Sequence, residues 1–426
     1  MVISPHVYLR IRSMRHRDAP LLPGLKGIYI PHATCQAWRS HPDLSFALLL
    51  LASESSLNLI ELNNDSATSD RQFFIPFLSL LSVNSPHLAR LALCRIKDAS
   101  ACLGLVPRFR SLQSLELRLS GACLDFQTVQ DLGTLDNLLD MTLKIPSITP
   151  TTKHNLTSAA STNYPTFVKL RKLHIIGTPS SISRVLGYMN ILTNLTTLII
   201  DEKTDDLNPE VDIESSWKSC FATISTFSAI EDIEINQLDI VFPDEAPFDG
   251  YCAISTSYLR PLYKLKNVTS FAINNSILLG SNDDLRLLAC SFPKLKKFVT
   301  PCSDYSEERT LACLVHFSQA NLDLREMKIS ISSDLSANLK AIDVLERPIK
   351  NHQHPLKKLH ISSQFDSLDL SEMIQIAQFL DHIFPNLSIL AAYGSSIAEV
   401  SSWTKIQKIR VALQATRIDA CSSRKI

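Results

Sequence analysis

The chain has 426 residues, and its 42 Lys and Arg balance 42 Asp and Glu, so the formal net charge is zero. A neutral chain has no general attraction to nucleic acid or to an anionic membrane, and we predict that it binds neither. The longest apolar run, residues 46–52, is much shorter than the roughly 20 residues that a membrane-spanning helix needs.

The amino terminus lacks the apolar segment of a secretory signal, and the ten cysteines are scattered without a C-x-x-C pair. Both features predict a cytoplasmic or nuclear protein with reduced thiols. The start is basic and free of acidic residues as far as Asp18, so a mitochondrial presequence is an alternative. The alternation of Val7, Leu9 and Ile11 favours a first strand instead.

A six-residue pattern, apolar-x-x-apolar-x-apolar, recurs along the whole chain. It starts at Leu25, Leu57, Leu88, Leu112, Leu138, Leu170, Leu195, Ile230, Val268, Leu295, Leu324, Leu356, Leu387 and Ile406. About 14 units at a mean spacing of roughly 29 residues lie at the upper end of the leucine-rich-repeat range. The Asn or Cys that closes the standard motif is mostly missing, so we expect irregular repeats.

Residues 181–200 show what one unit contains. Apolar residues at helical spacing come first, namely Ile182, Val185, Leu186 and Met189, with Ser180 and Ser181 placed to cap the helix. A strand pattern starting at Leu195 follows. Neither half can bury its apolar face alone, so the units must stack. We therefore predict one α/β leucine-rich-repeat solenoid, a horseshoe with parallel strands on the concave face and helices outside.

The predicted domain organisation is a single irregular leucine-rich-repeat domain over 1–426, because no polar linker separates two parts. Polar or acidic stretches at 145–165 and 201–214 are expected to be surface-loop insertions. Residues 412–426 are expected to form a carboxy-terminal cap and polar tail. Residues 71–81 predict a helix disturbed by Pro76, and Asp369-x-x-Glu372 predicts a capping box at the start of another.

Several segments in order suggest a known family: VYLRIRSM, PLLPGLKGIYI, ISRVLGYMNILTNLTTLII, LRPLYKLKNVTSFAI, SNDDLRLLACSFPKLKKF and IAQFLDHIFPNLSIL, the last followed by Trp403. This succession resembles the repeat region of the large F-box/leucine-rich-repeat family of mushroom-forming fungi. The resemblance implies that the repeats recruit a protein target. In that family an amino-terminal F-box docks on the adaptor of a cullin-type ubiquitin ligase.

The F-box itself is not visible, because Leu22-Pro23 is followed by Gly24-Leu25 and a strand pattern. We expect either a truncated gene product or a form without the adaptor-binding module. The ligase adaptor and cullin are expected partners only if an F-box lies upstream. The alternative function is a stand-alone leucine-rich-repeat scaffold or binding protein with no link to a ligase.

Residues between the apolar positions of each strand are expected on the concave face. These positions predict an acidic patch followed by a basic strip, formed by Asp232, Glu234, Lys297, Lys328, Lys358, His360, Lys408 and Arg410, with Lys296 and Lys357 beside them. A basic strip can recruit an acidic or phosphorylated segment of a partner. The alternative is that these cations serve solubility and prevent strand-edge pairing.

Neither catalysis nor a cofactor is expected. The chain has ten glycines and contains no P-loop, G-x-S-x-G or Rossmann pattern. His316, His352, His354 and His360 lack the Cys partners and tight spacing of a structural zinc site, and the turn KNHQHP should be exposed. Asp283-Asp284 fits a helix amino terminus better than a metal site. Cys94 and Cys302 lie near strand ends, where packing is the simpler role.

Overall fold

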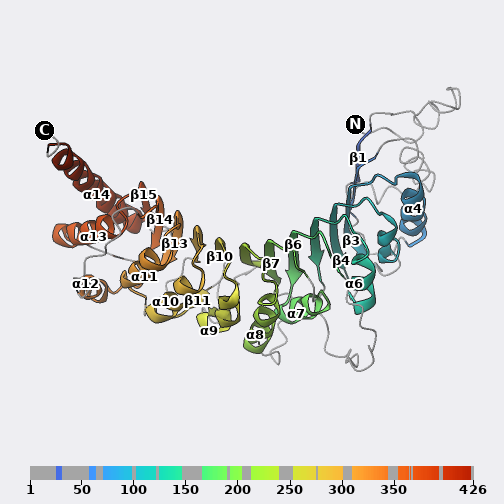
Figure 1. Ribbon diagram of the computed structural model, residues 1–426, viewed down its shortest axis with the longest axis horizontal. Helices are drawn as coiled ribbons and strands as arrows, with labels where there is room; N and C mark the ends of the chain where they lie inside the picture. The colour runs from blue at the N-terminus through green and yellow to red at the C-terminus, as the bar shows by residue number, and fades with distance from the viewer. Residues whose placement is uncertain are drawn as a thin grey trace. The chain divides into compact units, whose positions relative to one another are not determined.

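The computed structural model describes residues 25–30, 57–63, 71–97, 102–120, 124–145, 166–189, 192–203, 213–238, 253–274, 277–300, 309–343, 354–363, 365, 368–392 and 397–423. The chain forms two compact units, Met1–Thr223 and Ile224–Ile426. In each unit, parallel strands make one layer and helices cover one face of the sheet (Figure 1). The other face, which the helices leave uncovered, is called the open face.

The described residues of the first unit form seven parallel strands that pair in chain order. They are β1 (Gly27–Ile30), β2 (Leu59–Asn63), β3 (Arg90–Lys97), β4 (Ser114–Ser120), β5 (Asp140–Lys144), β6 (Lys172–Gly177) and β7 (Thr197–Lys203). Its helices are α4 (Arg71–Asn84), which contains Pro76, the 3-10 turn η1 (Val106–Arg108), α6 (Phe126–Leu132), α7 (Pro179–Tyr188) and α8 (Ile213–Ile224).

The second unit repeats the arrangement. Its main parallel sheet consists of β8 (Asp232–Leu238), β10 (Ser270–Asn274), β12 (Lys297–Val299), β13 (Glu326–Ser330), β14 (Lys358–Ser362) and β15 (Ile389–Ala392). A small second sheet pairs β9 (Ala253–Ser255) with β11 (Ile277–Leu279). The helices are α9 (Thr256–Leu259), the 3-10 turn η3 (Arg260–Lys264), α10 (Asn282–Ser291), α11 (Ala312–Ala320), α12 (Leu335–Asp343), α13 (Leu370–Ile383) and α14 (Ile397–Ser423).

The repeated apolar positions form the core between strands and helices. In the repeat of β6, Leu170, Leu173 and Ile175 are fully buried, because alternate strand residues face the helices. Helix residues at i, i+3 and i+4, such as Leu285, Leu288 and Ala289 of α10, are buried from the other side. The predicted α/β leucine-rich-repeat fold is confirmed by this strand and helix succession.

An asparagine directly before the first apolar residue of the six-residue pattern links neighbouring repeats. The side-chain amide donates to a backbone carbonyl of the preceding repeat at four places: Asn137 to Arg110, Asn194 to Val168, Asn267 to Ser228 and Asn386 to His354. These asparagines bond the turns of adjacent repeats to each other. They supply an inter-repeat contact in a chain that mostly lacks the standard closing residue of the motif.

Helix starts agree with the sequence in two cases and differ in a third. Asp369 with Glu372 on α13 and Ser281 with Asp284 on α10 each form a complete capping box. Helix α7 starts one turn earlier than expected, because Thr178 caps it and Pro179 occupies its first turn. Ser180 and Ser181 are therefore inside the helix, and their predicted capping role is wrong.

Three predicted segment boundaries need correction. The strand predicted from Ile406 does not form, since 397–423 are one helix, and the tail predicted at 412–426 is helical as far as Ser423. The insertion predicted at 201–214 is shorter, because β7 runs to Lys203 and α8 starts at Ile213. Of the loop predicted at 145–165, Ile145 is a buried residue whose amide donates to the Ile176 carbonyl, and 146–165 lie outside the described residues.

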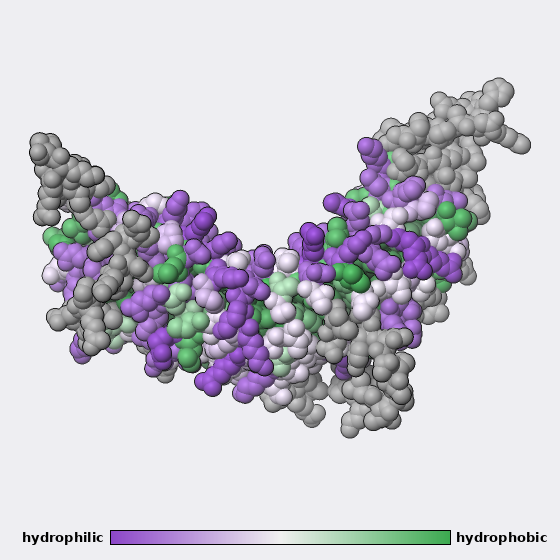
Figure 2. Space-filling view, in the orientation of Figure 1, coloured by the Kyte–Doolittle hydropathy of each residue, from purple (hydrophilic) through white to green (hydrophobic). Residues whose placement is uncertain are grey.

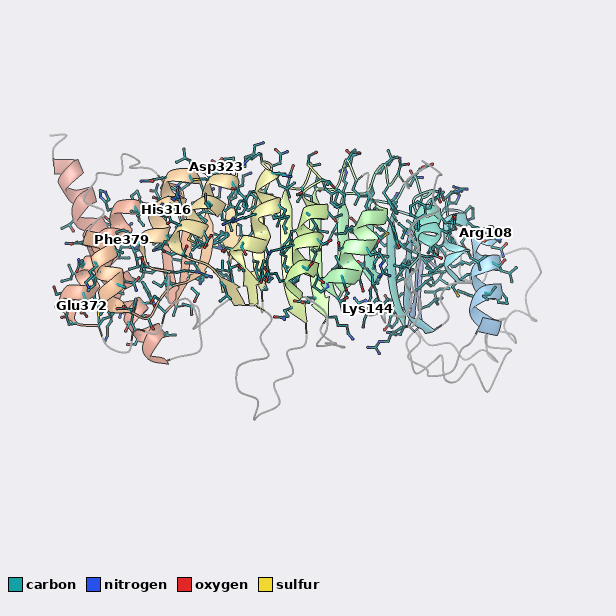
Figure 3. All side chains as sticks on the ribbon, turned by 90° about the horizontal axis from the view of Figure 1, so that it is seen from below. Arg108, Lys144, His316, Asp323, Glu372 and Phe379 are labelled. Atoms are coloured by element: carbon teal, nitrogen blue, oxygen red, sulfur yellow. The ribbon has the colours of Figure 1, made fainter. Side chains whose placement is uncertain are left out.

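The helices of the second unit return along the sheet against the strand direction. In Figure 3, Asp323, in the turn before β13, lies at one edge of this unit, and Glu372, in the first turn of α13, lies near the opposite edge.

Within the part of the chain described, no helix is both long and apolar enough to span a bilayer.

Candidate partner-binding face

The face predicted to be concave is the open face of the sheet, and strand register sets the order of its side chains in the second unit. One row across the strands contains Asp232, Ser270, Lys297, Glu326, Lys358 and Ile389. The next row contains Glu234, Ala272, Val299, Lys328, His360 and Ala391. Six of the eight candidate residues predicted from the sequence therefore lie on one face: Asp232, Glu234, Lys297, Lys328, Lys358 and His360.

The acidic end of this face lies on β8 and is held by hydrogen bonds. Thr269 Oγ1 donates to Asp232 Oδ1 at 3.3 Å. Asn274 Nδ2 donates to Glu234 Oε1 at 3.3 Å and to Asn236 Oδ1 at 2.8 Å. Both carboxylates thus have neutral partners from β10 or the residue before it, so they contribute negative charge to this end of the face.

A dense group of cations occupies the other end. The basic face is defined as Lys296, Lys297, Arg325, Lys357 and Lys358, all of which are exposed. The Arg325 amide donates to the Lys296 carbonyl and the Lys357 amide to the Arg325 carbonyl, so these residues follow each other on successive strands. Adjacent parallel strands are about 4.8 Å apart, which brings the five cations together at the starts of three neighbouring strands.

None of these five side chains forms an ion pair within the described residues. Hydrophilic residues gather on the strand side of the second unit around β13 and β14 in the space-filling view (Figure 2). Sequence reasoning missed Arg325, although it occupies the second position of its repeat exactly as Lys296 and Lys357 do in theirs. Counting that position in every repeat would have found it.

Lys408 and Arg410 do not belong to this face. Both lie on α14, where Lys408 is exposed and Arg410 is fully buried. The Arg410 Nε and Nη2 groups donate to Gln407 Oε1 at 3.1 and 3.0 Å. The prediction failed because Trp403, Ile406 and Arg410 are buried at a helical spacing of three and four residues, which the six-residue strand pattern partly imitates.

Helix α14 closes the end of the second unit. Trp403 is fully buried, and its indole Nε1 donates to Ser363 Oγ at 3.2 Å. Gln407 and Gln414 donate from their side-chain amides to the carbonyls of Ser388 and Pro385, beside the last strand. The helix covers the edge of β15 and satisfies polar groups there, which limits pairing with another chain.

His360 lies on the open face beside Lys328, its register partner on β13, and two residues after Lys358 on its own strand. Partial burial lowers its pKa below the ordinary value, and the positive charges of Lys328 and Lys358 act in the same direction, while Glu326 opposes them. His360 is therefore mostly neutral near pH 7 and both its ring nitrogens can serve as hydrogen-bond partners.

The other histidines considered for metal binding have structural surroundings. His354 is buried rather than in an exposed turn: its Nε2 lies 3.1 Å from the Asn321 carbonyl, and its Nδ1 accepts from the Leu356 amide. Burial lowers the pKa of His316 on α11, an outer-layer helix in Figure 3. Nowhere in the described part of the chain do three or more His, Cys, Asp or Glu side chains gather so as to hold a metal ion. His352 lies outside that part.

The described cysteines carry no sign of activation. Cys94, Cys102, Cys220 and Cys313 are buried free thiols, and Cys290 is an exposed one. Burial, with Glu116 adding to it, raises the pKa of Cys94 to about 11. A thiol that stays protonated at neutral pH is a poor nucleophile. Cys302 lies outside the described residues.

In the first unit, β7 carries two buried acidic residues that the sequence had placed in a loop. Asp201 Oδ2 lies 2.7 Å from His174 Nε2 on the open face. Glu202 points the other way, beside Trp217 and Cys220 of α8, and is only 3% exposed. Burial raises the pKa of Glu202 to about 7, although the Trp217 indole partly offsets this. The apolar strand pattern ends at Ile200, so the sequence did not indicate that Asp201 contacts His174 or that Glu202 lies beside Trp217 and Cys220.

Comparison with known proteins gives remote structural likenesses. No protein-family model matches the chain, and no curated protein matches it in sequence. A crystal structure of the yeast Rad7–Elc1 complex is 13% identical, with 92% of this chain and 87% of that chain covered and a TM-score of 0.35. The APL1 leucine-rich-repeat domain is 13% identical, with 88% and 75% covered and a TM-score of 0.35.

A chain of the TLR13–ssRNA13 complex is 12% identical, with 80% of this chain and 52% of that chain covered and a TM-score of 0.25. The class of this protein rests on its own geometry. Parallel strands joined through helices, with the six-residue apolar pattern facing the core, make it an α/β leucine-rich-repeat solenoid.

Proposed function

We propose that this chain is a protein-binding solenoid whose basic face takes an acidic or phosphorylated segment of a partner. The observation that carries the proposal is the gathering of five exposed cations at the starts of β12, β13 and β14, where none of them forms an ion pair with another described residue. Cations serving solubility alone would gain from being interspersed evenly with acidic residues, whereas these five have one carboxylate, Glu326, among them, and the excess positive charge attracts an anionic partner.

A protein partner fits this face better than single-stranded nucleic acid. Binders of single strands combine cations with exposed aromatic side chains on which bases stack. The basic face and its neighbours Glu326, Lys328 and His360 include no Phe, Tyr or Trp. Phe271 and Phe298 of the same strands face the core and are fully buried. Charge-assisted hydrogen bonds to carboxylates or phosphoryl groups are what such a face can offer.

The chain contains its own matched control for this proposal. Arg171 and Lys172 occupy the same repeat positions before and in β6 as Lys357 and Lys358 do at β14, and all four are exposed. We expect Lys357→Glu with Lys358→Glu to weaken partner binding about tenfold or more, and Arg171→Glu with Lys172→Glu to leave it within about twofold. Neither pair should change the melting temperature, since the side chains are on the surface.

The experiment is affinity capture from cell extract with the wild-type chain and both double variants, quantified by mass spectrometry. A partner retained by the β6 variant and lost by the β14 variant supports the basic face as the binding site. Equal recovery with both variants contradicts it. Arg410 is left unchanged because reversing a buried charge would unfold the second unit and mimic a loss of binding.

We further propose that the chain is the target-recognition part of an F-box-type ubiquitin ligase acting in the cytoplasm or nucleus. The resemblance of its ordered repeat segments to the fungal F-box/leucine-rich-repeat family supports this proposal. The same capture, run with and without proteasome inhibition, tests it. Recovery of a ligase adaptor and cullin, with a partner that accumulates under inhibition, is the expected result. A partner recovered without ligase components would favour the stand-alone binding protein.

A further inference from the structure

Four side chains of β13 and β14 form a compact patch beside the basic face. Glu326 and Lys328 lie on β13, and their register partners Lys358 and His360 lie on β14. Alternate residues of a strand are about 7 Å apart and neighbouring strands about 5 Å, so the patch is the size of one small tetrahedral anion. Strand register places all four side chains on the open face, and the charges of the other three act on His360.

Among the described residues, the charged groups that act on His360 belong to this patch. On β13 they are Glu326 and Lys328, and on its own strand the group is Lys358. On the other side, β15 presents Ile389 and Ala391, which carry no charge. With neutral His360 the patch has a net charge of +1, and protonation of the imidazole makes it +2.

We propose that Lys328, Lys358 and His360 of this patch form a subsite for one phosphoryl group, and that His360 gains a proton when the group binds. This inference rests on the proposed function and names the ligand chemistry of its site. The proton comes from solvent and forms an N–H bond on the imidazole, with no bond broken in the ligand. A dianion balances a patch of charge +2, whereas a carboxylate balances +1 and needs no proton.

The sign of the pH dependence follows from the surroundings of His360. In the free protein, burial and then the charge of Lys328 disfavour the imidazolium form. A bound dianion favours that form, so the pKa of His360 is higher in the complex. Dianion affinity must therefore rise as pH falls through the pKa of the complex, and level off below the pKa of the free protein.

Glu326 opposes the binding of anions at the subsite. Its carboxylate lies between Lys297 and Lys358 in the same row, two residues before Lys328 on its own strand and diagonal to His360. It repels a dianion more strongly than a monoanion, and the imidazolium that a dianion stabilises at His360 offsets this repulsion. We expect Glu326→Gln to strengthen dianion binding about two- to fivefold without removing the pH dependence.

Sulfate is the probe for the test, because it stays dianionic over the whole range in which histidine titrates. The His360 ring signals of the full chain are followed by NMR in sulfate, in acetate and in chloride at equal ionic strength. Sulfate should raise the pKa of His360 and bind about three- to tenfold more tightly near pH 6 than near pH 8. Acetate should do neither, and His382→Gln, a change at an exposed residue of α13, should alter nothing.

His360→Gln should keep sulfate binding near pH 8, read from the backbone amides of β13 and β14, and lose the increase toward pH 6. Sulfate binding that is independent of pH, or that leaves the His360 signals unchanged, overturns the inference. That failure is distinct from failure of the proposed function, which depends on partner capture by the Lys357 and Lys358 variant. An equal response to sulfate and acetate would show a general anion site and also overturn it.

Discussion

Strands β6 and β14 have nearly the same sequence and very different surroundings. Residues 170–175 read Leu-Arg-Lys-Leu-His-Ile, and residues 356–361 read Leu-Lys-Lys-Leu-His-Ile. On the core side the two repeats agree, since the three apolar residues of each are fully buried. On the open face they diverge. His174 lies 2.7 Å from the carboxylate of Asp201, whereas His360 lies among Lys328, Lys358 and Glu326.

The difference comes from the neighbouring strands. β6 lies between β5, which presents Asp140 beside Lys172, and β7, which presents Asp201. β14 lies between β13, which presents Lys328 beside His360, and β15, which presents apolar residues. A repeat therefore determines its own burial, while the adjacent repeats determine the electrostatic character of its open face. A binding site in a solenoid is a property of several consecutive repeats.

Of the changes that test this comparison, the largest effect on stability is expected at Glu202, a buried acidic residue of β7, the strand next to β6. Its pKa in the folded protein is about 7, above the ordinary 4.5. Between these values the folded state keeps a proton that the unfolded state has lost, so stability falls as pH rises through this window and is constant above it. Glu202→Gln should remove this fall and stabilise the protein near pH 8 by on the order of 2 kcal/mol.

Urea unfolding at several pH values, followed by circular dichroism, measures this effect. Near pH 4 the variant and the wild type should have nearly equal stability, which serves as the internal control. A variant less stable than the wild type near pH 8 would mean that the Glu202 carboxylate is ionised and stabilising in the folded state.

A smaller effect is expected at Asp201, whose contact with His174 distinguishes the open face of β6 from that of β14. Asp201→Asn removes a charge-assisted hydrogen bond in a largely buried position, and we expect a loss of about 1 to 2 kcal/mol in the free energy of unfolding. Ala391→Asp, the converse change beside His360, tests the other half of the comparison, because it should raise the pKa of His360 in an NMR titration. Unchanged stability and an unchanged His360 would show that neighbouring strands do not control these histidines.

The smallest effect concerns a feature that the two regions share. Asn194 and Asn386 precede the strands that follow β6 and β14, and each donates to the turn before the earlier strand. Asn194→Ala and Asn386→Ala should each cost about 1 kcal/mol in urea unfolding, since each leaves a backbone carbonyl without its partner. Asn→Asp at the same positions, which keeps the size but loses the donor, should cost a similar amount. A large cost at one site and none at the other would contradict the shared role.

The sequence determined the elements built on local periodicity. Strands follow thirteen of the fourteen predicted starts, the predicted capping box of Asp369 and Glu372 formed, and Asp283-Asp284 lies in the first turn of a helix as expected. Hydrophobic period and capping chemistry act over a few residues, so they can be read without knowing the fold. The same local reading placed six of the eight candidate residues on one face, because strand alternation fixes which side chains face away from the core.

Tertiary structure decided the rest. The pattern from Ile406 fits a strand and a helix, and packing of Trp403, Ile406 and Arg410 at the end of the second unit selects the helix. Arg325 joins the basic face, and Asp201 reaches His174, only because parallel pairing brings residues about 30 positions apart onto adjacent strands. Charge environments depend on contacts across repeats, and no periodicity within one repeat contains that information.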